Sequence, residues 1–199
     1  MRLQFVIITL PNFIDNEATI INQIMAQHKQ CIVHIRKPDA PAELVDNLIN
    51  SIDSEHYNRI VIHYNFDLAA RYHLGGIHLS GKTPTAPYGW QGRVSASCHS
   101  LDEVKQKAAE CDYVFLSPIF NSISKNGYNA AFSDAELCEA RTQGIITPKV
   151  YALGGITPEK IAQISTWGFG GFAVLGDIWR AENADAILNR VAAFITETE

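Results

Sequence analysis

Short segments rich in β-branched and aromatic residues alternate with segments of helical apolar spacing along the whole chain, and this alternation constrains the fold most. It is typical of repeated βαβ units around a parallel sheet. The predicted strands are residues 3–10, 31–35, 59–63, 76–79, 94–98, 113–116, 149–153 and 171–174. The predicted helices are residues 16–29, 41–52, 67–73, 100–110, 134–143, 157–167 and 184–198. Eight strands in strict alternation favour one closed (β/α)8 TIM barrel over a doubly wound open sheet.

Two predicted helices begin with recognisable capping residues, and one connection between strands shows little helical pattern. Ser100 and Glu103 have the spacing of a capping box, and Thr157 precedes a proline at the first helical position. The fourth connection, residues 80–93, is poor in helical pattern. Without a low-complexity or Pro/Ser-rich linker, residues 1–199 are predicted to form one barrel domain.

Charge and cysteine usage exclude several classes of partner. A net charge of -5 gives no general attraction to nucleic acid or to an anionic membrane. The apolar run that begins at Leu3 is too short for a membrane span and lacks the cleavage pattern of a signal peptide. The four cysteines are scattered without C-x-x-C spacing, and no histidine pair has local metal-ligand spacing. We therefore predict a cytoplasmic protein and no protein metal site.

The strongest local motif is a strand that ends in Gly154 and Gly155 just before a predicted helix start. Glycines let backbone N–H groups approach an anion closely, and a helix N-terminus adds partial positive charge. The next strand also runs into glycine, at Leu175 and Gly176. Because the loops after strands seven and eight of such barrels often hold phosphate, these two turns are predicted to bind a substrate phosphate. Tight strand-to-helix turns are the alternative explanation of the glycines.

Polar residues also follow other predicted strands, where the mouth of a barrel would lie. Arg36 follows strand two and could clamp a phosphate, whereas a surface ion pair is the alternative. His63, His78 and Ser97 stand near the ends of strands three, four and five, where each could equally be a satisfied rim group. The loop 117–128 adds Ser122, Ser124 and Lys125, whose hydroxyls and ammonium could donate hydrogen bonds to a pyrophosphate. A solvated loop is the alternative.

Taken together, these motifs make the chain resemble the family of thiamine phosphate synthase and thiazole tautomerase. The matching segments are His34-Ile-Arg36, Asp67-Leu-Ala69, Gly76-Ile-His-Leu79, Cys98-His-Ser-Leu-Asp-Glu103, Asp112-Tyr-Val114, Pro118-Ile-Phe120 and Gly154-Gly-Ile-Thr-Pro158. Synthases of this family join a pyrimidine diphosphate to a thiazole phosphate and release pyrophosphate with the help of Mg²⁺. The resemblance implies a (β/α)8 barrel that acts in thiamine biosynthesis on a small phosphorylated heteroaromatic substrate.

The resemblance also implies roles for individual residues. It assigns the substrate phosphate to Gly154, Gly155, Leu175 and Gly176. It assigns the pyrophosphate and pyrimidine to the strand-end and loop residues His34, Arg36, Ser97, Ser122, Ser124 and Lys125. Mg²⁺ is expected only if the synthase interpretation holds, and no other cofactor motif is present.

Several positions depart from the family pattern. The Asn-Asp pair of strand three is replaced by His63 and Tyr64, and the later Mg²⁺-binding Asp falls on Thr83. Neither a phenol nor a hydroxyl replaces a carboxylate for this hard cation, so Asp67 or Asp177 would have to bind it instead. The lysine that follows strand two in synthases is lost or moved to Lys37.

These departures leave alternatives open. A thiazole tautomerase-like isomerase would use His63 or His78 as general acid and base, because the histidine of that branch falls on Pro118. A non-catalytic barrel that only binds a phosphate ligand is a second alternative. An isomerase or aldolase of another kind is a third, with Lys82 and Lys125 as the loop lysines. A homodimer is left open, with Ile178 and Trp179 either in the core or at its surface.

Overall fold

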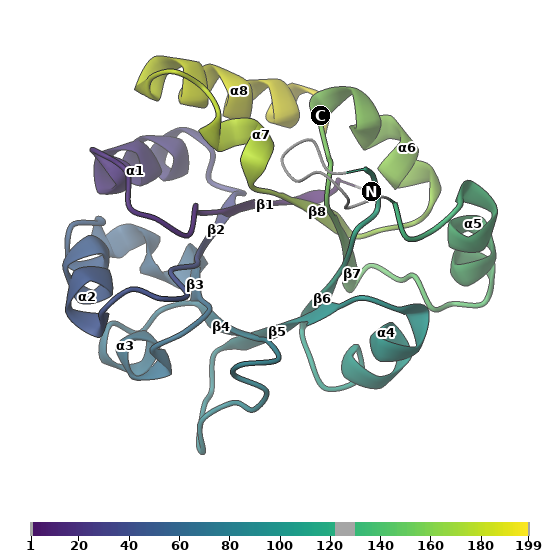
Figure 1. Cartoon of the computed structure of the whole chain (residues 1–199), viewed down its shortest axis with the longest axis horizontal. Coiled ribbons are helices and arrows are strands. Elements are labelled where there is room, and N and C mark those ends of the chain that lie inside the picture. Colours follow the sequence, from purple (N-terminus) through teal and green to yellow (C-terminus); the bar gives the residue numbers. More distant parts are fainter. Residues whose placement is uncertain (1, 122–129, 199) are drawn as a thin grey trace.

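A computed structural model of the chain describes residues 2–121 and 130–198 and shows a closed barrel of eight parallel strands. The strands are β1 (Gln4–Ile8), β2 (Ile32–Ile35), β3 (Ile60–Ile62), β4 (Gly76–Leu79), β5 (Arg93–Cys98), β6 (Tyr113–Leu116), β7 (Val150–Leu153) and β8 (Gly171–Val174). Each pairs with its sequence neighbours, and β1 closes the ring against β8. The predicted (β/α)8 fold is confirmed (Figure 1).

Helices surround the strands in the order that the alternation predicts (Figure 1). They are α1 (Glu17–Gln27), α2 (Ala42–Asn50), α3 (Phe66–Arg71), α4 (Leu101–Lys107), α5 (Asp134–Thr142), α6 (Ile161–Thr166), α7 (Gly176–Trp179) and α8 (Ala184–Thr196), with short 3₁₀-helices η1 (Ser54–Arg59) and η2 (Pro158–Lys160). The connection between β4 and β5 contains no helix, as expected, and projects outward beside α3 (Figure 1). No helix of the described residues is long and apolar enough to cross a membrane.

Two helix starts differ in detail from the sequence expectation. Ser100 caps α4 by accepting from the N–H of Glu103, but the Glu103 carboxylate accepts from the N–H of His99, so the capping box is not reciprocal. Thr157 makes no side-chain cap, and Pro158 opens the 3₁₀ turn η2 rather than an α-helix. The α-helix α6 therefore begins only at Ile161, after this 3₁₀ turn.

Two apolar layers make up the core, one on each side of the strands. The larger lies between the strands and the helices, and it includes Ile178 and Trp179. Trp179 also donates from Nε1 to the carbonyl of Ile8 at 2.8 Å, so these two residues belong to the core. The smaller layer fills the barrel interior with Val6, Ile8, Ile32, Val61, Tyr113, Phe115 and Ala173. Successive side chains of a strand point to opposite faces, so every second residue near a strand end also points into the barrel.

Candidate functional site

Three histidines from consecutive strands meet inside the barrel at the carboxyl-terminal ends of β2, β3 and β4. His34 lies on β2, His63 follows β3 and His78 lies on β4, and all three are buried. The register explains one contact, because Ile62 pairs with Ile77 and the next residues along are His63 and His78. Their rings stack with centroids 4.2 Å apart and planes inclined by 26°.

A hydrogen-bonded network joins these histidines to neighbouring strands. His34 Nδ1 lies 3.0 Å from His63 Nε2, and His34 Nε2 lies 2.6 Å from the Tyr113 hydroxyl. His78 lies between two hydroxyls, with Nδ1 at 2.8 Å from Ser95 Oγ and Nε2 at 2.9 Å from Ser97 Oγ. The predicted site residues His34, His63, His78 and Ser97 are therefore brought together in one cluster, which we call the histidine cluster.

Burial keeps the histidine cluster uncharged at neutral pH. Desolvation, with smaller contributions from the charges of Arg36 and Lys107, lowers the pKa of His78 to about 3. Desolvation also lowers the pKa of His63 and His34 well below the usual value, and neighbouring histidines add to both effects. Three neutral imidazoles can bind a transition metal, because their lone pairs are not occupied by added protons.

Arg36 is one of the cations near the barrel mouth. Its charge contributes to the lowered pKa of both His63 and His78, which places the guanidinium near the histidine cluster. Within residues 2–121 and 130–198, no carboxylate forms an ion pair with Arg36. The alternative that Arg36 serves a surface ion pair therefore finds no support in the described chain, and the guanidinium is available for an anion.

Lys37 cannot replace the lysine that synthases carry after strand two. Its Nζ donates to both carboxylate oxygens of Glu17, at 2.7 and 2.8 Å, and to the carbonyls of Leu10 and Asn12. Lys37 and Glu17 are both buried, and the ammonium also lies 4.7 Å from the ring centre of Phe13. These contacts use all the donors of the ammonium, so Lys37 fixes the connection from β1 to α1.

The glycine turn after β7 has the backbone that the sequence motif predicts. Gly154 and Gly155 have φ of 102° and 63°, a region that favours glycine. A Cβ on Gly155 would also overlap the carbonyl of Asn121, so close packing against the connection after β6 adds to the need for glycine. Across the described residues, the N–H groups of Gly155 and Gly176 donate to no backbone carbonyl. Their assignment to phosphate remains a prediction that this geometry permits.

The residues present do not fit a magnesium ion. Tyr64 and Thr83 stand where the resemblance places the family carboxylates. The Thr83 hydroxyl is 3.0 Å from Ser80 Oγ and 3.3 Å from the carbonyl of His63. Asp177 is held by Arg190 through two contacts of 2.6 and 3.1 Å. Asp67 lines a cavity on the outer flank of the barrel. Mg²⁺ prefers carboxylate oxygen, so the substituted positions offer it the wrong donors.

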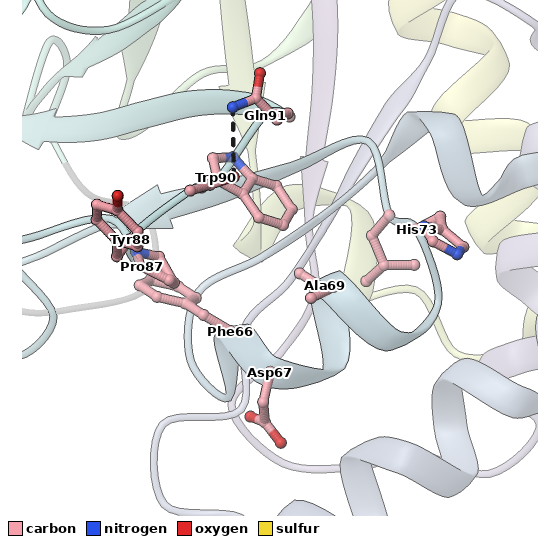
Figure 2. A pocket seen from close by; sticks show the side chains of 12 residues that line it. Phe66, Asp67, Ala69, His73, Pro87, Tyr88, Trp90 and Gln91 are labelled. Carbon is pink, nitrogen blue, oxygen red and sulfur yellow. Dashed lines mark hydrogen bonds between the residues drawn. The ribbon is translucent and has the colours of Figure 1, made fainter.

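A cavity of about 600 Å³ lies between α3 and the connection from β4 to β5. Figure 2 shows Trp90 and Pro87 on one side of it and Phe66 and Ala69 of α3 on the other. Because the connection contains no helix, only a loop covers the cavity on the side opposite α3. Of the residues considered for the site, only the possible metal ligand Asp67 lines this cavity, so we place the candidate site at the barrel mouth.

Some predicted residues fall outside the described chain, and one feature was missed. Ser122, Ser124 and Lys125 lie in residues 122–129, outside the described ranges. Local His-x-x-His spacing does not indicate the histidine cluster, because its members come from three different strands. The signal present in the sequence was one histidine near the end of each of three consecutive predicted strands, with a phase that directs all three inward.

Comparison with known proteins places these features in a family context. The family model described as thiamine monophosphate synthase matches residues 5–178. The thiamine-phosphate synthase of Erythrobacter litoralis is 28% identical over 146 residues, which are 70% of this chain and 68% of that protein. The thiamine-phosphate synthase of Anoxybacillus flavithermus is 33% identical over 129 residues, covering 62% of this chain and 58% of that protein, less than two thirds of its length.

Solved structures agree with the sequence matches. The crystal structure of thiamine phosphate pyrophosphorylase from Bacteroides thetaiotaomicron is 36% identical, has a TM-score of 0.88 and covers 99% of this chain and 97% of that chain. A thiamine phosphate pyrophosphorylase from Pyrococcus furiosus, at 17% identity, has a TM-score of 0.73 over 98% of this chain and 95% of its own, and this likeness supports the fold alone.

Proposed function

The chain belongs to the thiamine monophosphate synthase family, and from this premise we propose that it binds a thiazole phosphate at the barrel mouth and couples it to a pyrimidine diphosphate. The glycine turn carries this proposal, because Gly154 and Gly155 take left-handed backbone conformations at the end of β7, beside the glycine start of α7 after β8. Backbone N–H groups there suit a phosphate. The family resemblance inferred from the motifs is confirmed.

In the coupling reaction, the thiazole nitrogen forms a bond to the pyrimidine-bearing carbon while the bond from that carbon to pyrophosphate breaks. Negative charge then grows on the leaving pyrophosphate. We assign the stabilisation of this charge to Arg36, which has no ion pair within the described residues, together with Lys125, Ser122 and Ser124 of the loop after β6. Positive groups placed where charge develops lower the barrier to such a step. No step is assigned to Mg²⁺, because the residues present do not fit it.

A tautomerase-like isomerisation is the second candidate, and the histidine cluster favours it. A neutral imidazole can remove a proton and return it, although the lowered pKa makes His63 a weaker base than a free histidine. His63 is the histidine of the cluster with the largest exposure, at 5%. His78 is held between two serines and would position or support His63 rather than meet the substrate. We also propose that the protein is cytoplasmic and that it acts on small molecules, without a nucleic acid or membrane partner. A homodimer is compatible with this proposal.

Incubation of the purified protein with both substrates, with and without Mg²⁺, tests the proposal. Thiamine phosphate is followed by fluorescence after oxidation, and binding of the thiazole phosphate is measured in parallel by calorimetry. We expect binding and product formation that Mg²⁺ does not stimulate. Binding without product would instead favour the isomerase or a non-catalytic binder, and a strict Mg²⁺ requirement would show that another carboxylate takes over the metal. Failure to bind any thiazole phosphate would contradict the proposal.

A further inference from the structure

We propose that the histidine cluster is a binding site for one transition-metal ion of the zinc class, coordinated by His34, His63 and His78 inside the barrel. The three residues each offer one ring nitrogen, and these nitrogens lie within 4.8 Å of one another. The inference concerns metal binding alone and does not depend on the reaction proposed above. It also differs from the family's magnesium, since the donors here are nitrogen rather than oxygen.

The distance between the first two donors suits a shared ion. His34 Nδ1 and His63 Nε2 face each other at 3.0 Å. In a tetrahedral zinc site with metal–nitrogen bonds of about 2.0–2.1 Å, two ligand nitrogens are roughly 3.3 Å apart. A metal ion can therefore replace the hydrogen that these nitrogens share, with little separation of the two strands.

The third donor comes from the stacked ring of His78. Its centroid lies 4.2 Å from that of His63, so a rotation of the ring out of the stack is needed to direct a nitrogen at the same ion. Three protein nitrogens then leave the fourth tetrahedral position to water or to an oxygen of a bound ligand, which is the pattern of reactive zinc sites.

Partners of the remaining ring nitrogens support this arrangement. A metal-binding histidine usually donates its second N–H to a nearby oxygen, which fixes the ring. His34 Nε2 has the Tyr113 hydroxyl at 2.6 Å for this purpose. His78 gives up the contact with one of Ser95 and Ser97 to bind the ion and keeps a serine hydroxyl for its second nitrogen. One of His34 and His63 donates the hydrogen that lies between them, and only this ring needs to change tautomer. Its hydrogen moves to its other nitrogen, and the accepting ring already presents a lone pair. No proton has to leave the protein.

The surrounding charges select the class of metal. The positive charge of Arg36 acts on His63 and His78 and opposes any cation held mainly by electrostatic attraction. The nearest ring neighbours of the cluster include Phe115, and no carboxylate belongs to this group of three ligands. Imidazole nitrogen binds Zn²⁺, Cu²⁺, Ni²⁺ and Co²⁺ well, whereas Mg²⁺ requires hard oxygen ligands.

Metal titration of the full chain tests this inference without using its activity. The protein is freed of metal with a chelator, titrated with Co²⁺ by visible absorption and titrated with Zn²⁺ by calorimetry. We expect one ion per chain, a four-coordinate Co²⁺ spectrum that Zn²⁺ abolishes, and no competition from Mg²⁺. His63→Gln is the main variant, because it leaves the bonds of His78 to both serines in place; it should weaken Zn²⁺ binding about tenfold or more.

Two control variants separate this site from other histidines. His73→Asn removes an exposed histidine whose φ of 52° asparagine tolerates, and it should leave Zn²⁺ binding unchanged. His56→Gln tests the other group with metal-ligand spacing, formed by Asp53, Glu55 and His56. Absence of stoichiometric Zn²⁺ binding to the folded protein would overturn the inference. Unchanged affinity in a folded His63→Gln, or loss of binding in His56→Gln alone, would do the same, with folding checked by circular dichroism.

Discussion

The Nζ of Lys37, two residues after β2, lies 2.7 Å from Oε1 of Glu17 at the start of α1, and both side chains are buried. The family lysine after strand two has thus been replaced by a lysine that joins β2 to the first helix. This pair leads to a prediction of stability, because neither charge has access to water if its partner is removed.

Lys37→Met should lower the free energy of unfolding by about 3–5 kcal/mol, because it leaves the Glu17 carboxylate buried without its cation. Urea denaturation measures the change. The double variant Lys37→Met with Glu17→Leu should lose less than the sum of the two single variants. A loss of under about 1 kcal/mol in Lys37→Met would place the pair with ordinary surface salt bridges and contradict the prediction.

Stability should fall as the pH drops from 6.5 toward 3. The folded pKa of His34, His63 and His78 lies below the ordinary 6.5, so the unfolded chain binds more protons than the folded chain in this range. Each histidine should cost about 2 kcal/mol at pH 5 relative to pH 7.5. Urea midpoints at the two pH values measure the effect, and His63→Gln should show a smaller difference. Equal midpoints for the unmodified chain would disagree with neutral buried rings.

Arg36→Ala should weaken binding of a thiazole phosphate or pyrophosphate about 10-fold to 100-fold, which corresponds to the loss of charge-assisted hydrogen bonds of about 1.5–3 kcal/mol. The unfolding free energy should hardly change, because the described residues show no ion pair of Arg36. Calorimetry with each ligand and urea denaturation measure the two quantities. Lys82→Ala is the control, because it removes an exposed loop cation whose Nζ lies 3.7 Å from a carboxylate oxygen of Asp39. Equal losses in both variants would point to a diffuse charge effect.

Gly155→Ala should both destabilise the barrel and reduce phosphate binding. Its φ is 63° and its added Cβ would overlap the Asn121 carbonyl. Gly144→Ala is a matched control, because Gly144 has a φ of 70° with no atom within 4 Å of an added Cβ. The control should cost about 1 kcal/mol for the backbone conformation alone. Thermal unfolding and phosphate titration compare the two variants, and equal effects would mean that close packing at Gly155 is unimportant.

Much of the fold was predictable because periodic patterns act locally. The strand predicted at 113–116 and the helix predicted at 134–143 match β6 and α5 almost residue for residue. The start at Thr157 was less predictable, because a capping residue has to adopt one particular side-chain rotamer that the sequence does not specify. The glycines after β7 were also recognisable, since a strand that runs into two glycines has few alternatives to a turn.

The sequence by itself determined the alternation of strands and helices, the glycine turns and the placement of one histidine near each of three successive strand ends. Only the tertiary structure decided that these histidines meet, that Lys37 pairs with Glu17 and that Asp177 forms an ion pair with Arg190. The physical reason is distance along the chain. Local patterns depend on neighbouring residues, whereas these contacts depend on barrel closure and strand register, which bring side chains 13 to 29 residues apart within bonding distance.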